Sequence, residues 1–225
     1  MTYLQLVNAV LLRLREDPVV SVNSSDYSKL IAAFVNDAKD IVEKSWDWTH
    51  LREIVTIPTV ASTKEYTWTG KGNPVEFLTA WNNTSNSELY YTGQARFDKR
   101  NYTQASQSGT PEEFVLRSVD SNGDYVIEVY PTPDNVYSLV FNAKVEQVDL
   151  VDNSDAIIIP TVPVLHLALA FAARERGETG GTSTQEYFSI ADQYLSDAIA
   201  ADAAMHEAEL TMNAGYFWPN NTMRA

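Results

Sequence analysis

Apolar residues near the beginning of the chain recur at the spacing of a helix face. Over 2–15 they lie mostly three residues apart, on one side of a helix: Leu4, Val7, Val10, Leu11 and Leu14. Pro18 ends this helix, because proline cannot continue the helical hydrogen-bond pattern. A second helix is expected to begin near Ser25 or Asp26, either of which can cap its first turn, and to end around Trp46 to Trp48.

The pattern changes at about Leu51, where helical spacing gives way to short runs of β-branched and aromatic residues separated by turn residues. These runs predict strands over 52–60, 65–69, 75–81, 88–91, 113–119, 125–130 and 136–144. Two hairpins are expected among them. One spans 120–124, where Asn122-Gly123 supplies a positive φ, and the other spans 131–135.

Helical spacing returns in the last third of the chain. Pro163 precedes an Ala- and Leu-rich helix over 164–176, and a proline in a first helical turn costs little. Gly177 ends that helix. A last long helix is expected to continue to about Leu210. The remaining residues, 213–225, form an irregular tail that carries three consecutive aromatic residues: Tyr216, Phe217 and Trp218.

The order of elements is therefore two helices, a β region and two further helices, which is typical of the α+β class. Helices from the two ends of a chain most simply pack together as an antiparallel bundle, and the β region then forms an inserted antiparallel sheet lobe. We expect bundle helices at 1–50, the β lobe at 51–155, bundle helices again at 156–212, and an extended tail at 213–225.

The net charge of the 225-residue chain is −14. Binding to DNA phosphates needs Lys and Arg, so this charge disfavours specific DNA binding. It is compatible with DNA passing an acidic wall that repels the duplex, and equally with a role in solubility alone. The absence of Cys excludes disulfides, thiolate metal sites and a Cys nucleophile. We expect neither a signal peptide nor contact with a membrane, because no apolar run reaches the roughly 18–20 residues of a span.

The sequence contains little that points to catalysis. None of the spacings between its three histidines suits a metal site: His50, His166 and His206. Nucleotide-binding and nucleophile motifs are absent, so we expect a non-enzymatic protein with no cofactor and no metal. Two alternatives remain open. One is a glycan hydrolase that uses Glu112 or Glu113, and the other is a carbohydrate-binding module that stacks sugars on Trp68 and Trp81.

Basic residues form one cluster with aromatic neighbours, at Arg96, Lys99 and Arg100. Such interleaving can bind nucleic acid, but three charges are too few in a chain with a net charge of −14. A contact between these residues and an acidic neighbouring subunit is at least as well supported.

Five segments carry a resemblance to a known family. They are the opening helix at 3–16, the FVNDAKxxVExxWxW segment at 34–48, VDSNGD at 119–124, YPTPD at 130–134 and the ARERGExGG turn at 173–181. Together they resemble the podovirus-type phage head-to-tail adaptor proteins, also called tail tubular or gatekeeper proteins. The resemblance covers nearly the whole chain, and all five segments are structural signatures.

The resemblance implies a structural virion protein, assembled in the host cytoplasm, that forms a ring of commonly about twelve copies in the phage neck. The ring would join the portal protein to the tail nozzle protein around a channel through which DNA passes without specific binding, and tail fibres are a further partner left open. The aromatic tail would bind the portal, although folding back onto the bundle remains an alternative. The expected portal contacts are Tyr216, Phe217, Trp218 and Arg224, and the expected contacts between subunits are Arg96, Lys99 and Arg100.

Overall fold

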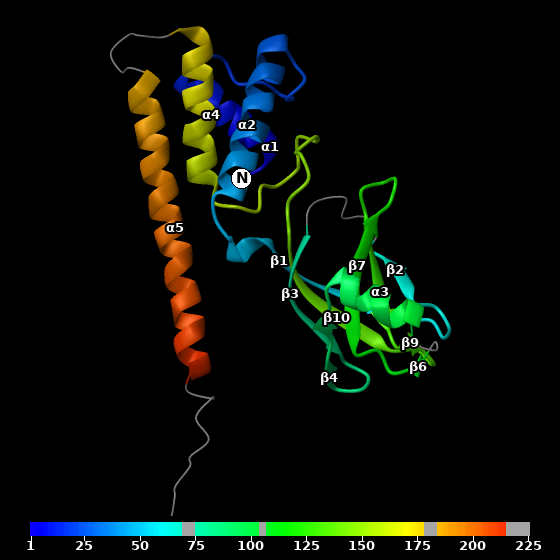
Figure 1. The fold of residues 1–225 in the computed structure, drawn as a ribbon. Coiled ribbons are helices and arrows are strands. Elements are labelled where there is room, and N and C mark those ends of the chain that lie inside the picture. Colours follow the sequence, from blue (N-terminus) through cyan, green and yellow to red (C-terminus); the bar gives the residue numbers. More distant parts are fainter. Residues whose placement is uncertain (69–74, 104–106, 178–183, 215–225) are drawn as a thin grey trace, which may run out of the picture. The chain divides into compact units, whose positions relative to one another are not determined.

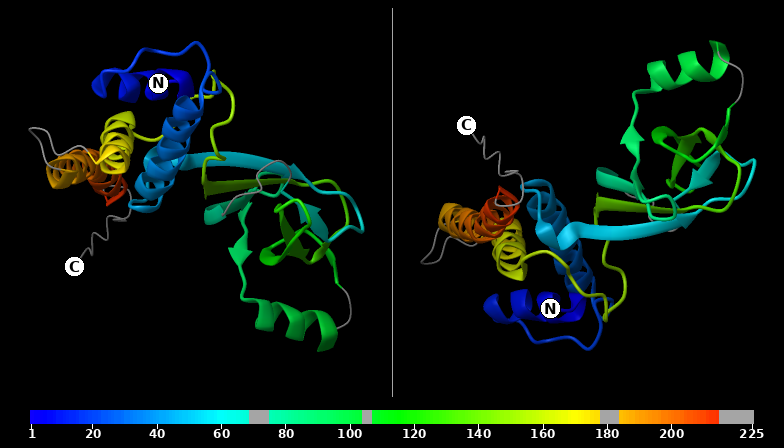
Figure 2. Two further views of the ribbon diagram at one scale, coloured as in Figure 1. Left: turned by 90° about the horizontal axis from the view of Figure 1, so that it is seen from above. Right: turned by 90° about the horizontal axis from the view of Figure 1, so that it is seen from below.

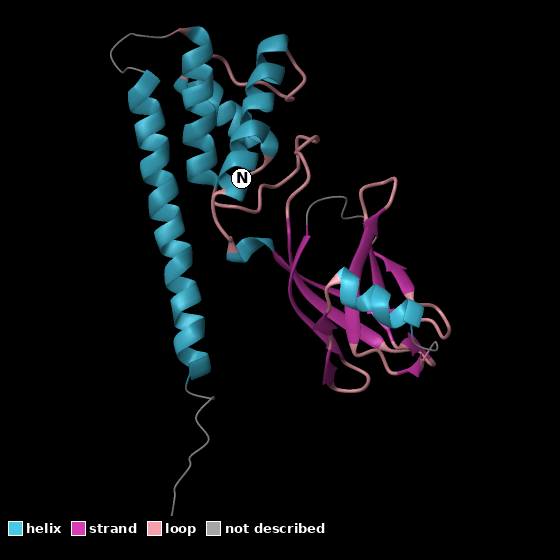
Figure 3. Cartoon of the chain, in the orientation of Figure 1, coloured by secondary structure: helices cyan, strands magenta, loops and turns pink. Residues whose placement is uncertain are grey.

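The computed structural model describes residues 1–68, 75–103, 107–177 and 184–214. The chain divides into two compact units. One, the helical unit, combines Met1–His50 with Asp149–Ala225, and the other, the β unit, is Leu51–Val148. The fold is therefore mixed α+β, with helical segments from both ends of the chain in one unit and the strands in the other (Figure 3).

The first two helices begin where their capping residues lie. Helix α1 spans Tyr3–Arg13 and helix α2 spans Asp26–Lys44. Thr2 and Ser25 each accept a hydrogen bond from the backbone of the third helical residue, whose side chain bonds back to the cap. This confirms the prediction that the second helix begins at Ser25 or Asp26.

Helix α4, Thr161–Arg176, is buried over most of its circumference and packs against α1, α2 and α5. It ends at Gly177, whose φ of 63° lies in the left-handed region, as the sequence predicts. Helix α5, Thr184–Ala214, runs beside α4 (Figure 1). Helix α1 lies crosswise to α4 and α5 (Figure 2). It therefore does not run antiparallel along them, as a helix of a simple bundle would.

The described residues of the β unit form two four-stranded sheets instead of the single expected sheet. The order in the first sheet is β1 (Arg52–Pro58), β10 (Ser138–Val145), β3 (Val75–Asn82) and β4 (Ser87–Glu88). The order in the second is β2 (Glu65–Thr67), β8 (Tyr125–Tyr130), β7 (Glu113–Val119) and β5 (Tyr90–Tyr91). A short pair joins β6 (Ser108–Gly109) to β9 (Thr132–Pro133). Pairing is antiparallel except for β5 with β7 and β6 with β9, which are parallel.

The core of the β unit is an aromatic cluster. Trp68, Phe77, Phe114 and Phe141 meet mostly edge to face, with ring centroids 5.2–6.0 Å apart. Such T-shaped pairs are each worth about 0.5–1.5 kcal/mol beyond the burial of their surface. Burial alternates along β10, since every second residue from Leu139 to Ala143 is buried.

The predicted hairpin across 120–124 is present, and the prediction of a second hairpin across 131–135 is wrong. Strands β7 and β8 pair across 120–124, with Gly123 at φ 86°. Strand β8 does not pair with β10, because the proline-containing segment after β8 pairs with β6 instead and the chain then enters the other sheet. The sequence also gives no indication of helix α3, Gln94–Thr103, because only one of its residues, Phe97, is buried and no apolar stripe exists.

Candidate functional site

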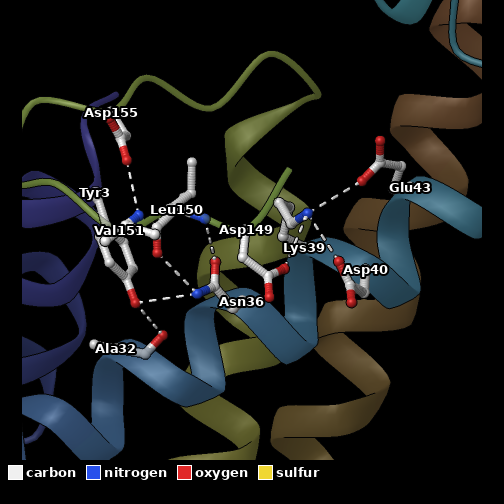
Figure 4. Close-up of polar contacts among 10 residues, drawn as sticks. All are labelled: Tyr3, Ala32, Asn36, Lys39, Asp40, Glu43, Asp149, Leu150, Val151 and Asp155. Atoms are coloured by element: carbon white, nitrogen blue, oxygen red, sulfur yellow. Dashed lines mark hydrogen bonds and ion pairs between the residues drawn. The ribbon is translucent and has the colours of Figure 1, made fainter. Parts of the chain in front are cut away.

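Residues 149–155 lead the chain back into the helical unit, and a row of polar residues on α2 binds them (Figure 4). Asn36 is the central residue. Its Nδ2 donates to the Leu150 carbonyl at 3.0 Å, and its Oδ1 accepts from the Leu150 N–H at 3.0 Å. One side-chain amide thus satisfies both backbone groups of a buried residue, as a paired strand would. We call the three residues Asn36, Tyr3 and Lys39, which all contact the returning segment or its neighbours, the return clamp.

Tyr3 extends the return clamp to α1. Its hydroxyl donates to the Ala32 carbonyl at 2.8 Å and accepts from Asn36 at 3.3 Å. Burial, with the nearby Asp149 and Asp155 carboxylates, raises the pKa of Tyr3 to about 12, so the phenol stays protonated and remains a donor. The backbone N–H of Tyr3 also donates to the Asp155 carbonyl at 2.7 Å. The first helix is therefore bound to the same segment as the second.

Lys39 is the third member of the return clamp, and only 1% of its side chain is exposed. Its Nζ lies 2.8 Å from Asp40, 3.4 Å from Glu43 and 3.7 Å from Asp149. Burial lowers the pKa of Lys39, but the three carboxylates outweigh burial and the pKa is raised overall. A buried cation therefore persists among acids, one of which, Asp149, is the first residue of the returning segment.

A second cluster fixes the end of the N-terminal helices, just before the chain enters the β unit. Asp202 on α5 is buried, and its Oδ2 accepts from Trp46 Nε1 at 2.9 Å and from the Thr49 N–H at 3.2 Å. His50 Nδ1 lies 3.8 Å from the other carboxylate oxygen. We call these residues the exit clamp. Trp46, Thr49 and His50 thus share one partner, Asp202.

The basic cluster lies on α3 and is partly used within the chain. Arg100 Nη1 lies 2.8 Å from Glu113 Oε1, and its guanidinium stacks 4.9 Å from the centre of the Tyr130 ring. Arg96 is 72% exposed in its side chain and lies 3.9 Å from Glu113, and Lys99 is exposed. Arg96 and Lys99 are therefore accessible to a partner, whereas the charge of Arg100 already faces a carboxylate.

The two alternative functions find little support in this geometry. Burial raises the pKa of Glu113, but hydrogen bonds from Arg100 and Thr92 outweigh it and the pKa is lowered overall. A glycosidase acid needs the opposite shift. Trp68 is 1% exposed and packed in the aromatic core, so no sugar can reach it, although Trp81 is 42% exposed. A stacking platform made of both tryptophans is therefore wrong.

Other candidates from the sequence have structural explanations. The His166 ring stacks on Tyr194 with centroids 4.4 Å apart, and burial, with the charge of Arg13, lowers its pKa. Within the described parts of the chain, no group of three or more His, Asp or Glu residues is arranged to hold a metal ion. No helix among the described residues has the length and apolar character to cross a membrane. The proposed portal contacts Tyr216, Phe217, Trp218 and Arg224 lie outside the described residues.

Sequence reasoning missed Asn36, Lys39 and Asp202, although α2 carried a signal for two of them. Asn36, Lys39 and Glu43 follow one another at intervals of three and four, so they form a polar row on a helix whose other buried positions, apart from Ser28, are apolar. A polar row at helical spacing can lie in water or be buried with partners, and only the returning segment, more than a hundred residues later, decides between the two. Asp202 carries no comparable signal, because α5 has several acids.

Comparison with known proteins gives one family. The family model described as SU10 adaptor protein matches residues 1–214. A comparison with curated proteins finds no match.

Proposed function

Because the chain belongs to the SU10 adaptor protein family, whose members are phage head-to-tail adaptors, we propose that it works as one copy of a ring that joins the portal protein to the tail nozzle protein. The family match carries this proposal, since it includes every helix and strand of both units. The protein is a structural component of the virion neck. Its helical unit, made from both ends of the chain, would form the body of the ring, which we expect to hold about twelve copies.

The two clamps support a role of the helical unit in holding both connections to the β unit. The exit clamp and the return clamp bind the residues immediately before and after the β unit by buried polar contacts. Buried hydrogen bonds to backbone and to charged groups fix a geometry, because leaving any partner unmet costs about 1–3 kcal/mol. In an adaptor, such contacts would keep the two connections to the β unit in place while the neck is under the pressure of packaged DNA.

The acidic charge supports passage of DNA without binding. With a net charge of −14 for each copy, a ring presents a strongly negative assembly to the duplex. Like charges keep DNA from adhering to the channel wall, and the effect weakens as salt screens the charges. Arg96 and Lys99 on α3 would meet an acidic surface of the neighbouring copy.

The C-terminal tail is the proposed portal contact. Tyr216, Phe217 and Trp218 are followed by Pro219 and lie in an otherwise polar, acid-free segment whose single charge is Arg224. Aromatic and Arg side chains are enriched among the residues that dominate binding energy at protein interfaces. A tail of this composition suits a groove on the portal.

Size-exclusion chromatography with light scattering tests the adaptor function, on the protein alone and mixed with the portal protein from the same phage. We expect a monomer of 25.2 kDa alone, and together with the portal a complex that contains additional mass of about 300 kDa, the mass of twelve copies. A monomer that leaves the portal peak unchanged in mass would refute the proposal.

A further inference from the structure

Strand β3 has one edge that is largely open within the described residues. On one side it pairs with β10 along its whole length, from Val75 to Asn82. On its other side β4 pairs only with Trp81 and Asn82 (Figure 1). Over Val75–Thr79, no described strand occupies that second side. An open strand edge presents backbone N–H and C=O groups to any extended peptide that reaches it.

A cavity of about 400 Å³ lies along this open edge. Its floor is the aromatic core, where Phe77 and Phe114 meet at 5.5 Å between ring centroids. The residues that line it come from β3, from the β4–β5 segment and from β7: Val75, Glu76, Phe77, Leu78, Thr79, Ala80, Glu88, Leu89, Tyr90, Tyr91, Phe114 and Leu116. A strand edge beside an apolar floor offers both requirements of strand addition, backbone pairing for affinity and a pocket for alternate side chains.

The rim of the cavity carries exposed aromatic and acidic side chains. Tyr90 and Tyr91 are 59% and 60% exposed, and Glu76 and Glu88 are exposed on β3 and β4. Among the described residues that line the cavity, these two acids are the only charged side chains. An occupant that matches the rim is therefore apolar at alternate positions, contains a basic residue, and is poor in acids.

A second copy of this chain does not match that chemistry. Its net charge is −14, and the irregular segment after β10, which is exposed in part, contains Glu146, Asp149, Asp152 and Asp155. These acids would meet Glu76 and Glu88 with like charge. The acid-free tail is already assigned to the portal under the proposed function. The occupant is therefore a segment of a different virion protein.

We infer that the cavity along β3 is a docking groove for an extended, basic and apolar segment of the tail nozzle protein, which adds as a strand beside Val75–Thr79. This inference rests on the proposed adaptor function and names the partner's chemistry and its mode of binding. The added strand continues the line begun by β4, buries the apolar floor, and places its basic residue against Glu76 and Glu88.

Site-specific cross-linking tests the groove directly, because the chain has no native Cys. A Thr79→Cys variant labelled with benzophenone maleimide places the cross-linker on the open edge, and Thr56→Cys on β1 places it at an exposed position that does not line the cavity. Both are mixed with nozzle protein from the same phage, irradiated and mapped by mass spectrometry. We expect a Thr79→Cys adduct confined to one extended, basic nozzle segment, and none from Thr56→Cys.

Charge reversal gives an independent measurement on the assembled complex. The double variant Glu76→Lys/Glu88→Lys should weaken nozzle binding by about tenfold, measured as Kd, whereas Glu65→Lys, an exposed acid on β2, should leave Kd within about twofold. Circular dichroism confirms that each variant folds.

The outcomes separate the groove from the adaptor function. Absence of any binding between adaptor and nozzle would refute the proposed function itself. Binding that is intact in the charge-reversal variant, with no adduct from Thr79→Cys, would refute the groove alone. Adducts to residues 69–74 of the same chain, to another copy or to the portal would also overturn the inference, because they would identify a different occupant.

Discussion

At the scale of single residues, Asn36 carries the most specific prediction. Changing Asn36→Ala removes the only side chain described here that pairs with both backbone groups of Leu150, which is 3% exposed. Two buried backbone groups then lose their partners, and we expect the free energy of unfolding of the helical unit to fall by about 2–4 kcal/mol. Urea unfolding followed by circular dichroism at 222 nm measures this change.

Asn23→Ala is the matched control for Asn36→Ala. Asn23 lies in the connector between α1 and α2 and is exposed, so the same truncation should change stability by less than about 0.5 kcal/mol. Equal unfolding midpoints for the two variants would show that Asn36 does not hold the returning segment.

The same residue shows where sequence reasoning ends. The apolar stripe of α2 could be predicted because burial of one helix face is a local property of the sequence. Asn36, Lys39 and Asp202 each contact a residue far away in the sequence, at separations of 114, 110 and more than 150 residues, so no local pattern specifies these contacts. Trp68, just after β2, and Trp81, in β3, give the same lesson, since their exposure differs by a factor of about forty and Trp68 is the one packed in the core.

At the scale of elements, the end of α4 depends on one backbone conformation. Gly177 has a φ of 63°, and a Cβ added there would meet no atom within 4 Å. The cost of Gly177→Ala is therefore conformational, about 1–2 kcal/mol, because an L-residue is strained in the left-handed region. Thermal unfolding should show a stability loss of this size, with no change in the β unit.

Gly109→Ala serves as the control for Gly177→Ala. A Cβ at Gly109 also meets nothing within 4 Å, and its φ is not positive in the left-handed sense. We expect this variant to be neutral or slightly more stable than the wild type, since alanine restricts the unfolded chain. Destabilisation of equal size in both variants would contradict the explanation from backbone conformation.

Elements with a strong local signal were predicted and those without one were not. Helices α1, α2 and α4 have caps, an apolar stripe or a terminating glycine in the sequence, and strands β7 and β8 meet at an Asn-Gly turn. Helix α3 buries only Phe97, so its pattern is that of a polar loop. Strand β10 pairs with β1 and β3, which lie 56 or more residues before it in the sequence. The sequence predicted a hairpin with β8 instead, because β8 is the nearest predicted strand before β10 along the chain.

At the scale of the whole molecule, the proposed binding to the portal depends on the tail. Removing residues 213–225 deletes Tyr216, Phe217 and Trp218 and leaves untouched every contact of the two clamps and of the aromatic core. We expect the truncated chain to keep the circular dichroism spectrum and unfolding midpoint of the full chain and to lose portal binding in light scattering.

Single substitutions distinguish a specific tail contact from a loss of length. Trp218→Ala should weaken portal binding by about 2 kcal/mol, or roughly thirtyfold in Kd, because buried tryptophans dominate the energy of interfaces. Thr222→Ala, in the same tail, should change Kd by less than about twofold, since Thr is rare among such residues. If truncation lowers the unfolding midpoint instead, the aromatic tail packs on its own helical unit. If truncation and Trp218→Ala both leave portal binding intact, the ring joins the portal through another part of the chain.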